Sequence, residues 1–163
     1  MACLVLSRPP SHPSGEGVIV IHPAPKARRP GEDDASFHAR VFAQTLAKNP
    51  SMQGLASLAL TVEQLPSRRF RNAWRLVAGQ VVEDLPTCRA IRLTEIRRDR
   101  DARLLASDGP YTRALERGED LTALKAYRQG LRDVPQSAGS ALDACASPSM
   151  VAAYEPSWPA RVV

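Results

Sequence analysis

The stretch that decides the fold is YRQGLRDVP, residues 127–135. Leu124, Tyr127 and Leu131 follow one another at spacings of three and four residues, which places them on one face of a helix. Pro135 cannot continue the backbone hydrogen bonds of a helix, and it disfavours helical angles in the residue before it. The stretch therefore predicts an amphipathic helix that covers residues 121–132 and ends before Pro135.

A longer helix is predicted upstream. Leu85-Pro86-Thr87 opens it, because proline and threonine favour the first helical positions. Ser107-Asp108-Gly109-Pro110 is expected to end it, and a short helical segment over 112–117 follows. Asp120 is placed to cap the helix over 121–132. Residues 85–135 are thus predicted to form an antiparallel helical hairpin or a small bundle.

The first half of the chain has the pattern of a small sheet. Residues 2–6 and 17–22 are apolar and rich in β-branched side chains, so they are expected to pair as strands. Residues 33–48 carry one apolar stripe behind acidic residues, which predicts a helix that stops at Asn49-Pro50. Residues 54–60 fit a short strand or a covered loop.

A β-hairpin is expected over residues 71–83, with its turn near Ala78-Gly79. Its predicted partner is the N-terminal strand pair, with the helix over 33–48 laid across one face of the sheet. The predicted fold class is therefore α+β, with an N-terminal domain over residues 1–84 and the helical region over 85–135.

The chain after Pro135 has few large apolar residues up to Ala153. Such a composition cannot bury much surface, so a flexible linker is predicted. Tyr154-Glu155-Pro156-Ser157-Trp158-Pro159 is aromatic and proline-rich, and it is expected to be an extended arm that docks. Linker and arm together make up residues 136–163.

Composition narrows the function classes. The net charge is +5, from 22 basic and 17 acidic residues. The basic residues of the long helix alternate with acids, whereas a nucleic-acid binder concentrates them on one face. Three widely spaced cysteines favour a reducing compartment. No signal-peptide pattern or apolar run of membrane length occurs, so we expect the protein to be cytoplasmic when made.

No catalytic pattern emerges from the residue types. The chain lacks a recognisable nucleophile with a base, a phosphate loop or a cluster of acids. Isolated candidates are better explained as turns, helix caps or core residues: Gly15-Glu16-Gly17, Asp33-Asp34, Glu83-Asp84, His22, His38 and Cys88. We therefore predict a non-enzyme without cofactor, metal or small-molecule ligand.

Three motifs in order carry a family resemblance. They are RRDRDARLLASD over residues 97–108, AYRQGLRDVP over 126–135, and Trp158-Pro159. This order resembles the tail assembly chaperone family of tailed bacteriophages. Two departures stand out, because Gly109-Pro110 separate Asp108 from Tyr111 and the interval between Pro135 and Trp158 is longer than in many members.

The resemblance implies a non-enzymatic protein of the host cytoplasm. Such a protein binds a tail-fibre or other tail or baseplate subunit and helps it fold, trimerise or join the tail. A second hypothesis is a structural virion component that links fibre to tail or baseplate, and a weaker third is a DNA-binding regulator that uses the arginine-rich helix.

Candidate partner-binding residues come from the last two motifs and the arm. For the apolar residues of the helix over 121–132 the competing interpretation is packing on the long helix, and for the arginines it is pairing with Asp99, Asp101 or Asp108. The terminal tryptophan is expected to cover its own domain or to enter a pocket of a partner. The candidates are Tyr127, Arg128, Leu131, Arg132, Tyr154, Trp158 and Pro159.

Overall fold

The structure is a computed structural model that describes residues 2–12 and 15–162. The chain divides into two compact units, Met1–Asp84 and Leu85–Val163. The first unit holds all five strands and the helix α1, and the second holds the helices α2, α3 and α4. The predicted α+β class is confirmed.

A three-stranded antiparallel sheet forms the centre of the first unit. Its strands are β1 (Ala2–Arg8), β2 (Gly17–Ile21) and β3 (Ser57–Thr61), in the order β2-β1-β3. In the register, Val5 lies opposite Val20 on one side and Leu58 on the other. The predicted pairing of the first two strands is confirmed, and the segment within 54–60 is a strand rather than a covered loop.

The predicted hairpin is also present, as β4 (Trp74–Val77) and β5 (Gln80–Glu83). Ala78 and Gly79 at its tip have φ of 49° and 75°, the backbone of a two-residue turn that suits the twist of a hairpin. The prediction that this hairpin pairs with the N-terminal strands is wrong. It is a separate two-stranded sheet that does not pair with β1, β2 or β3.

The two sheets of this unit meet through side chains instead. Cys3 and Val5 of β1 form one buried cluster with Trp74 and Val81 of the hairpin. Leu6, on the opposite face of β1, is only 1% exposed. β1 is thus buried on both faces, which explains why its sequence is continuously apolar rather than alternating.

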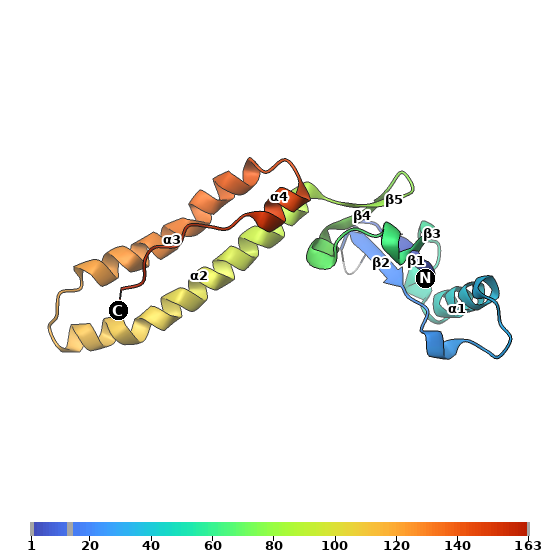
Figure 1. The fold of residues 1–163 in the computed structure, drawn as a ribbon, viewed down its shortest axis with the longest axis horizontal. Helices are drawn as coiled ribbons and strands as arrows, with labels where there is room; N and C mark the ends of the chain where they lie inside the picture. Colours follow the sequence, from blue (N-terminus) through green and yellow to red (C-terminus); the bar gives the residue numbers. More distant parts are fainter. Residues whose placement is uncertain (1, 13–14, 163) are drawn as a thin grey trace. The chain divides into compact units, whose positions relative to one another are not determined.

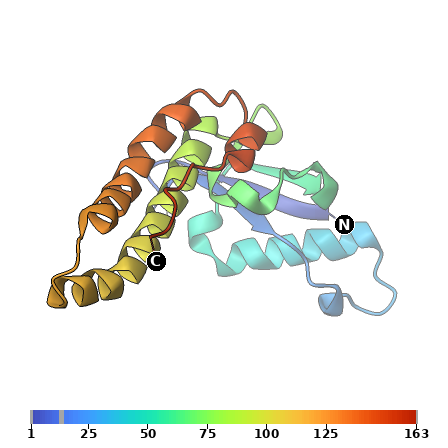
Figure 2. The ribbon, with the colours of Figure 1, turned by 60° about the vertical axis from the view of Figure 1, so that its left-hand side comes forward.

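The helix α1 (Asp34–Lys48) lies along the three-stranded sheet (Figure 2). The Asp33 side chain accepts a hydrogen bond from the Ser36 N–H and caps the helix, as the acids of the sequence indicated. Phe37 is its buried residue. Four short 3₁₀ turns complete the unit, at Pro25–Ala27, Pro50–Met52, Val62–Gln64 and Arg68–Ala73.

The second unit is a long helical hairpin (Figure 1). Its arms are α2 (Leu85–Glu116) and α3 (Thr122–Asp143), which pack side by side in antiparallel order. The short helix α4 (Pro148–Ala153) packs against α2. The predicted helical hairpin is confirmed.

The predicted end of α1 before Pro50 is confirmed, but the helix ends predicted at Pro110 and Pro135 are wrong. α2 continues through Pro110 to Glu116, and α3 continues through Pro135 to Asp143. Each proline removes one backbone donor, but packing continues beyond it: Ala114 is 6% exposed on α2 and Leu142 is 1% exposed on α3. Burial of the continuing stripe outweighs the local loss of a hydrogen bond.

The predicted flexible linker is also wrong. Residues 136–143 belong to α3, and Pro148–Ala153 form α4, where the Ser147 hydroxyl caps the helix by accepting from the Met150 N–H. Ala138 and Leu142 extend the stripe of Leu131 by seven and eleven positions. Small residues close to a neighbouring helix can form an interface without large apolar side chains, which is why composition misled.

Candidate partner-binding site

The seam between α2 and α3 contains the apolar candidates. Tyr127 is 8% exposed and Leu131 is 0% exposed. They belong to a stripe on α3 that repeats at intervals of three and four residues, the pattern of two helices that pack nearly parallel to each other. These two side chains therefore hold the hairpin together. The buried stripe comprises Leu124, Tyr127, Leu131, Val134, Pro135, Ala138 and Leu142.

Arg128 anchors a polar section of the same seam. Its Nη1 donates to the Ser107 hydroxyl and to the Asp108 carboxylate, both at 2.6 Å, and more weakly to the Leu104 carbonyl at 3.4 Å. Its guanidinium also lies 5.2 Å from the centre of the Tyr111 ring. Asp108 was one of the three carboxylates expected for this arginine. The side chain of Arg128 is 18% exposed, so one edge of this anchor reaches the surface.

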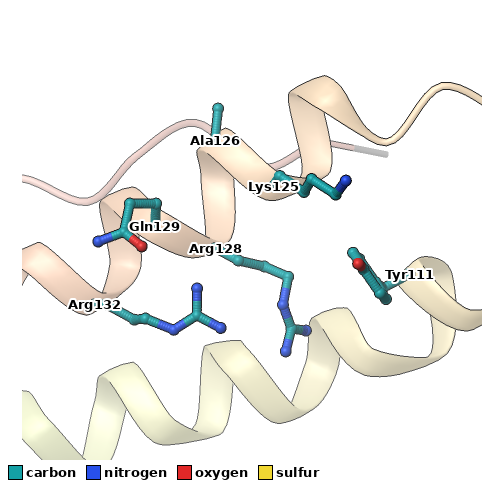
Figure 3. Close-up of a pocket in the computed structure, with 6 residues that line it drawn as sticks. All are labelled: Tyr111, Lys125, Ala126, Arg128, Gln129 and Arg132. Carbon is teal, nitrogen blue, oxygen red and sulfur yellow. The ribbon is translucent and has the colours of Figure 1, made fainter.

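An open cleft lies beside this anchor (Figure 3). Its volume is about 550 Å³. One wall comes from Tyr111 near the end of α2, and the rest comes from two turns of α3. Three of the lining side chains are cations, and the lining contains no carboxylate. The lining residues are Tyr111, Lys125, Ala126, Arg128, Gln129 and Arg132.

The cations of the cleft differ in how firmly they are held. Arg128 is fixed by its bonds to α2, whereas Lys125 and Arg132 are exposed. Asp120 lies close enough to Lys125 for the ammonium to help lower its pKa, after the larger effect of the hydrogen bonds that Asp120 accepts from Thr122. The site thus presents positive charge on a rigid helical frame.

The segment after α4 lies along the hairpin (Figure 1). Arg103 of α2 is 4.4 Å from the centre of the Trp158 ring, a cation–π contact. Pro159 packs against α3 at Gly130, where an added Cβ would come within 3.3 Å of the proline ring. A shallow cavity of about 360 Å³ remains between α3 and this segment, and Tyr154, Trp158 and Pro159 line it.

Arg92 fastens the beginning of this segment. It is a buried residue of α2, 7% exposed, and its Nη2 donates to the Tyr154 carbonyl at 2.8 Å and to Glu155 at 3.1 Å. Nη1 donates to Glu95 at 3.1 Å. Arg92 was not among the predicted site residues, although its position four residues after Cys88 and four before Ile96 places it on the buried face.

The structure does not bring the isolated chemical candidates together. Cys88 is buried, and His38 stacks with Phe42 on α1 at a ring distance of 6.0 Å. Burial, with Arg68 and Arg71 nearby, lowers the pKa of His22. Among residues 2–12 and 15–162, no group of three or more histidine, cysteine or acidic side chains is arranged to hold a metal ion.

The helical hairpin thus combines a buried seam with an open cationic cleft at its surface. Residues 93–160 match the family described as Phage tail assembly chaperone protein. These residues make up nearly all of the helical hairpin, so this part of the chain is similar to the phage tail assembly chaperone family.

The other comparisons added no relative. Neither the curated proteins nor the solved structures gave a match. In the described part of the chain, no helix combines the length and the apolar character needed to cross a membrane.

Proposed function

We propose that the helical hairpin binds a tail-fibre or other tail or baseplate subunit in the host cytoplasm and assists its folding or attachment. The observation that carries the proposal is the position of the family match. Residues 93–160 cover the cationic cleft and the segment with Trp158, and they exclude the first unit entirely. A fibre partner would be trimeric if the chaperone acts after the fibre has assembled.

The proposed contact residues fall into two groups. Arg132, Tyr154, Trp158 and Pro159 lie on the exposed side of the hairpin or line its open cavities, so they can touch a partner directly. Tyr127 and Leu131 are buried, so they act by keeping α2 and α3 together. Arg128 belongs to both groups, because it bonds to α2 and lines the cleft.

Co-expression tests this proposal. The full chain is produced with each tail protein in turn, and capture of one of them by the tagged chain identifies the partner. The double variant Arg132→Glu with Trp158→Ala is expected to lose most of the captured subunit, while Arg98→Glu, an exposed site on α2, keeps it. Equal capture by the double variant and the unchanged chain would place the contact elsewhere.

A second candidate function follows from the first unit. Residues 1–84 form a compact unit of their own outside the family match, which suits a component that stays in the particle as a link between fibre and tail. Mass spectrometry of purified particles separates the two functions. Stoichiometric presence of the chain supports the virion component, and absence supports the transient chaperone.

A further inference from the structure

The two arginines of the cleft stand one helical turn apart on α3. Arg128 and Arg132 are at positions i and i+4, and Figure 3 shows both side chains directed to the same side of the helix, toward α2. Like charges at this spacing destabilise a helix. An anion that touches both guanidinium groups would remove this repulsion.

The rest of the lining supplies neutral donors and a third cation. Lys125 lies on the turn before Arg128, and Tyr111 and Gln129 add a phenol hydroxyl and an amide. The Asp108 carboxylate bonds to Arg128, and the Asp133 carboxylate accepts from Gln129 at 2.8 Å. Asp120 also lies near Lys125, so three acids around the cleft balance its three cations, but none of these acids lines the cleft itself.

The guanidinium of Arg128 is prepared for a second ligand. The hydrogen bonds to Leu104, Ser107 and Asp108 all come from Nη1. A guanidinium has donors on three nitrogen atoms, and its planar fork matches the two oxygen atoms of a carboxylate. Because the α2 contacts already hold the side chain, little conformational entropy is lost when an anion binds.

We infer that this cleft binds an acidic segment of the tail subunit, with glutamate or aspartate carboxylates on Arg128, Arg132 and Lys125. The inference rests on the proposed function and names the chemistry of its partner. An acidic polypeptide fits better than a nucleic acid. The positive charge is local, since residues 98–101 further along α2 (Arg-Asp-Arg-Asp) alternate in sign, and a phosphate backbone needs a continuous basic track.

The direct test titrates the full chain with a short oligoglutamate peptide, and with an oligoglutamine peptide of the same length as a control. The Arg132→Glu variant is expected to bind oligoglutamate about tenfold more weakly than the unchanged chain, as expected for loss of a charged hydrogen bond. Arg98→Glu changes the net charge by the same amount on an exposed site of α2 and is expected to leave the affinity within about twofold.

Three results would overturn the inference. The first is an equal loss of affinity in both variants, which would mean that only the overall charge matters. The second is equal binding of oligoglutamine, and the third is a preference for single-stranded DNA that disappears in Arg132→Glu. Circular dichroism of each variant tests for unfolding. We expect none, because Arg132 is exposed and its replacement leaves the seam between α2 and α3 intact.

The same variants separate this inference from the proposed function. If Arg132→Glu still captures the tail subunit with unchanged affinity while Trp158→Ala loses it, the hairpin is the binding unit but the acidic-segment inference fails. If neither change affects capture, the contact lies elsewhere and the acidic-segment inference fails, whereas the proposed function fails if the unchanged chain captures no tail protein. Loss of capture in Arg132→Glu but not in Arg98→Glu supports both.

Discussion

The two units of this chain build their buried contacts in different ways. In the first unit, residues distant in sequence converge on a small buried cluster, as Cys3 and Val5 meet Trp74 and Val81. In the helical hairpin, a regular stripe on α3 packs along α2 over many turns. Outside this stripe, α3 has an exposed face that includes Lys125, Gln129 and Arg132.

The motif over residues 127–135 contains both buried and exposed residues. Within the nine residues 127–135, Tyr127, Leu131, Val134 and Pro135 are buried, and Arg132 and Asp133 are exposed. The motif therefore records the packing of the hairpin and the chemistry of its surface together. The buried positions keep the two helices together, and the exposed ones are the positions that we propose for partner binding.

The largest expected effect is on the hairpin seam. Leu131→Ala removes a fully buried side chain and should lower the stability of this unit by about 2–5 kcal/mol. Leu115→Ala, on an exposed site of α2, should change it by less than about 0.5 kcal/mol. Native-state hydrogen exchange measures both, with the loss of protection confined to residues 85–162 and absent from β1. Equal effects of the two changes would contradict the packing of Leu131 between α2 and α3.

The polar section of the seam should come next. Arg128→Met removes the bonds to Ser107 and Asp108 and should cost about 1–3 kcal/mol. Arg132→Met, four residues further on, should stay within about 0.5 kcal/mol because that side chain is exposed. Urea unfolding followed by circular dichroism compares them. A greater cost for Arg132→Met would reverse the division of roles between the two arginines.

A smaller effect, of opposite sign, is expected in the first unit. Ala78 has φ of 49°, which costs an alanine roughly 1 kcal/mol and which asparagine tolerates better. Ala78→Asn should therefore raise the stability of the β4–β5 hairpin, and Ala78→Val should lower it. Hydrogen exchange of β4 and β5 is the measurement, with α3 unaffected. A loss of protection in Ala78→Asn would show that the turn is not of this type.

Acid should affect the first unit in part through the partly buried ion pair between Glu32 and Arg40. Hydrogen bonds from the Arg40 side chain and the Arg29 N–H lower the pKa of Glu32 from 4.5 to about 2. A depressed carboxyl pKa stabilises the folded state above its ordinary pKa, and this contribution is lost as pH falls from 4.5 to about 2. Thermal melts across this window should show a shallower acid loss for Glu32→Gln. An identical slope would mean that Glu32 does not contribute.

Local patterns predicted much of the fold, and long-range packing decided the rest. The strands β1 and β2, the turn at Ala78-Gly79, the helix α1 and the start of α2 followed from periodicity, capping and turn chemistry. The continuation of α2 and α3 through Pro110 and Pro135 did not, because it depends on burial against the other helix. The separate sheet of β4 and β5 was not predicted either, because it packs on β1 through long-range side-chain contacts and not through strand pairing.

The candidate site was predictable in part for a similar reason. Arg128 and Arg132 were evident from their spacing on a helix, and Asp108 was among the expected partners of these arginines. Tyr111 and Lys125 were not expected, since only the packing of α2 against α3 brings them to one cleft. The role of Arg92 was not predictable, because its hydrogen-bond partner is the backbone carbonyl of Tyr154, which is distant in the sequence.

The proposed function requires that the helical hairpin, and not the first unit, binds the tail subunit. Hydrogen–deuterium exchange of the full chain, alone and bound to the subunit that it captures, measures this. We expect new protection in the peptides that cover residues 125–132 and 154–162, with β1, β2 and α1 unchanged. Protection confined to residues 2–84, with the hairpin unchanged, would contradict it.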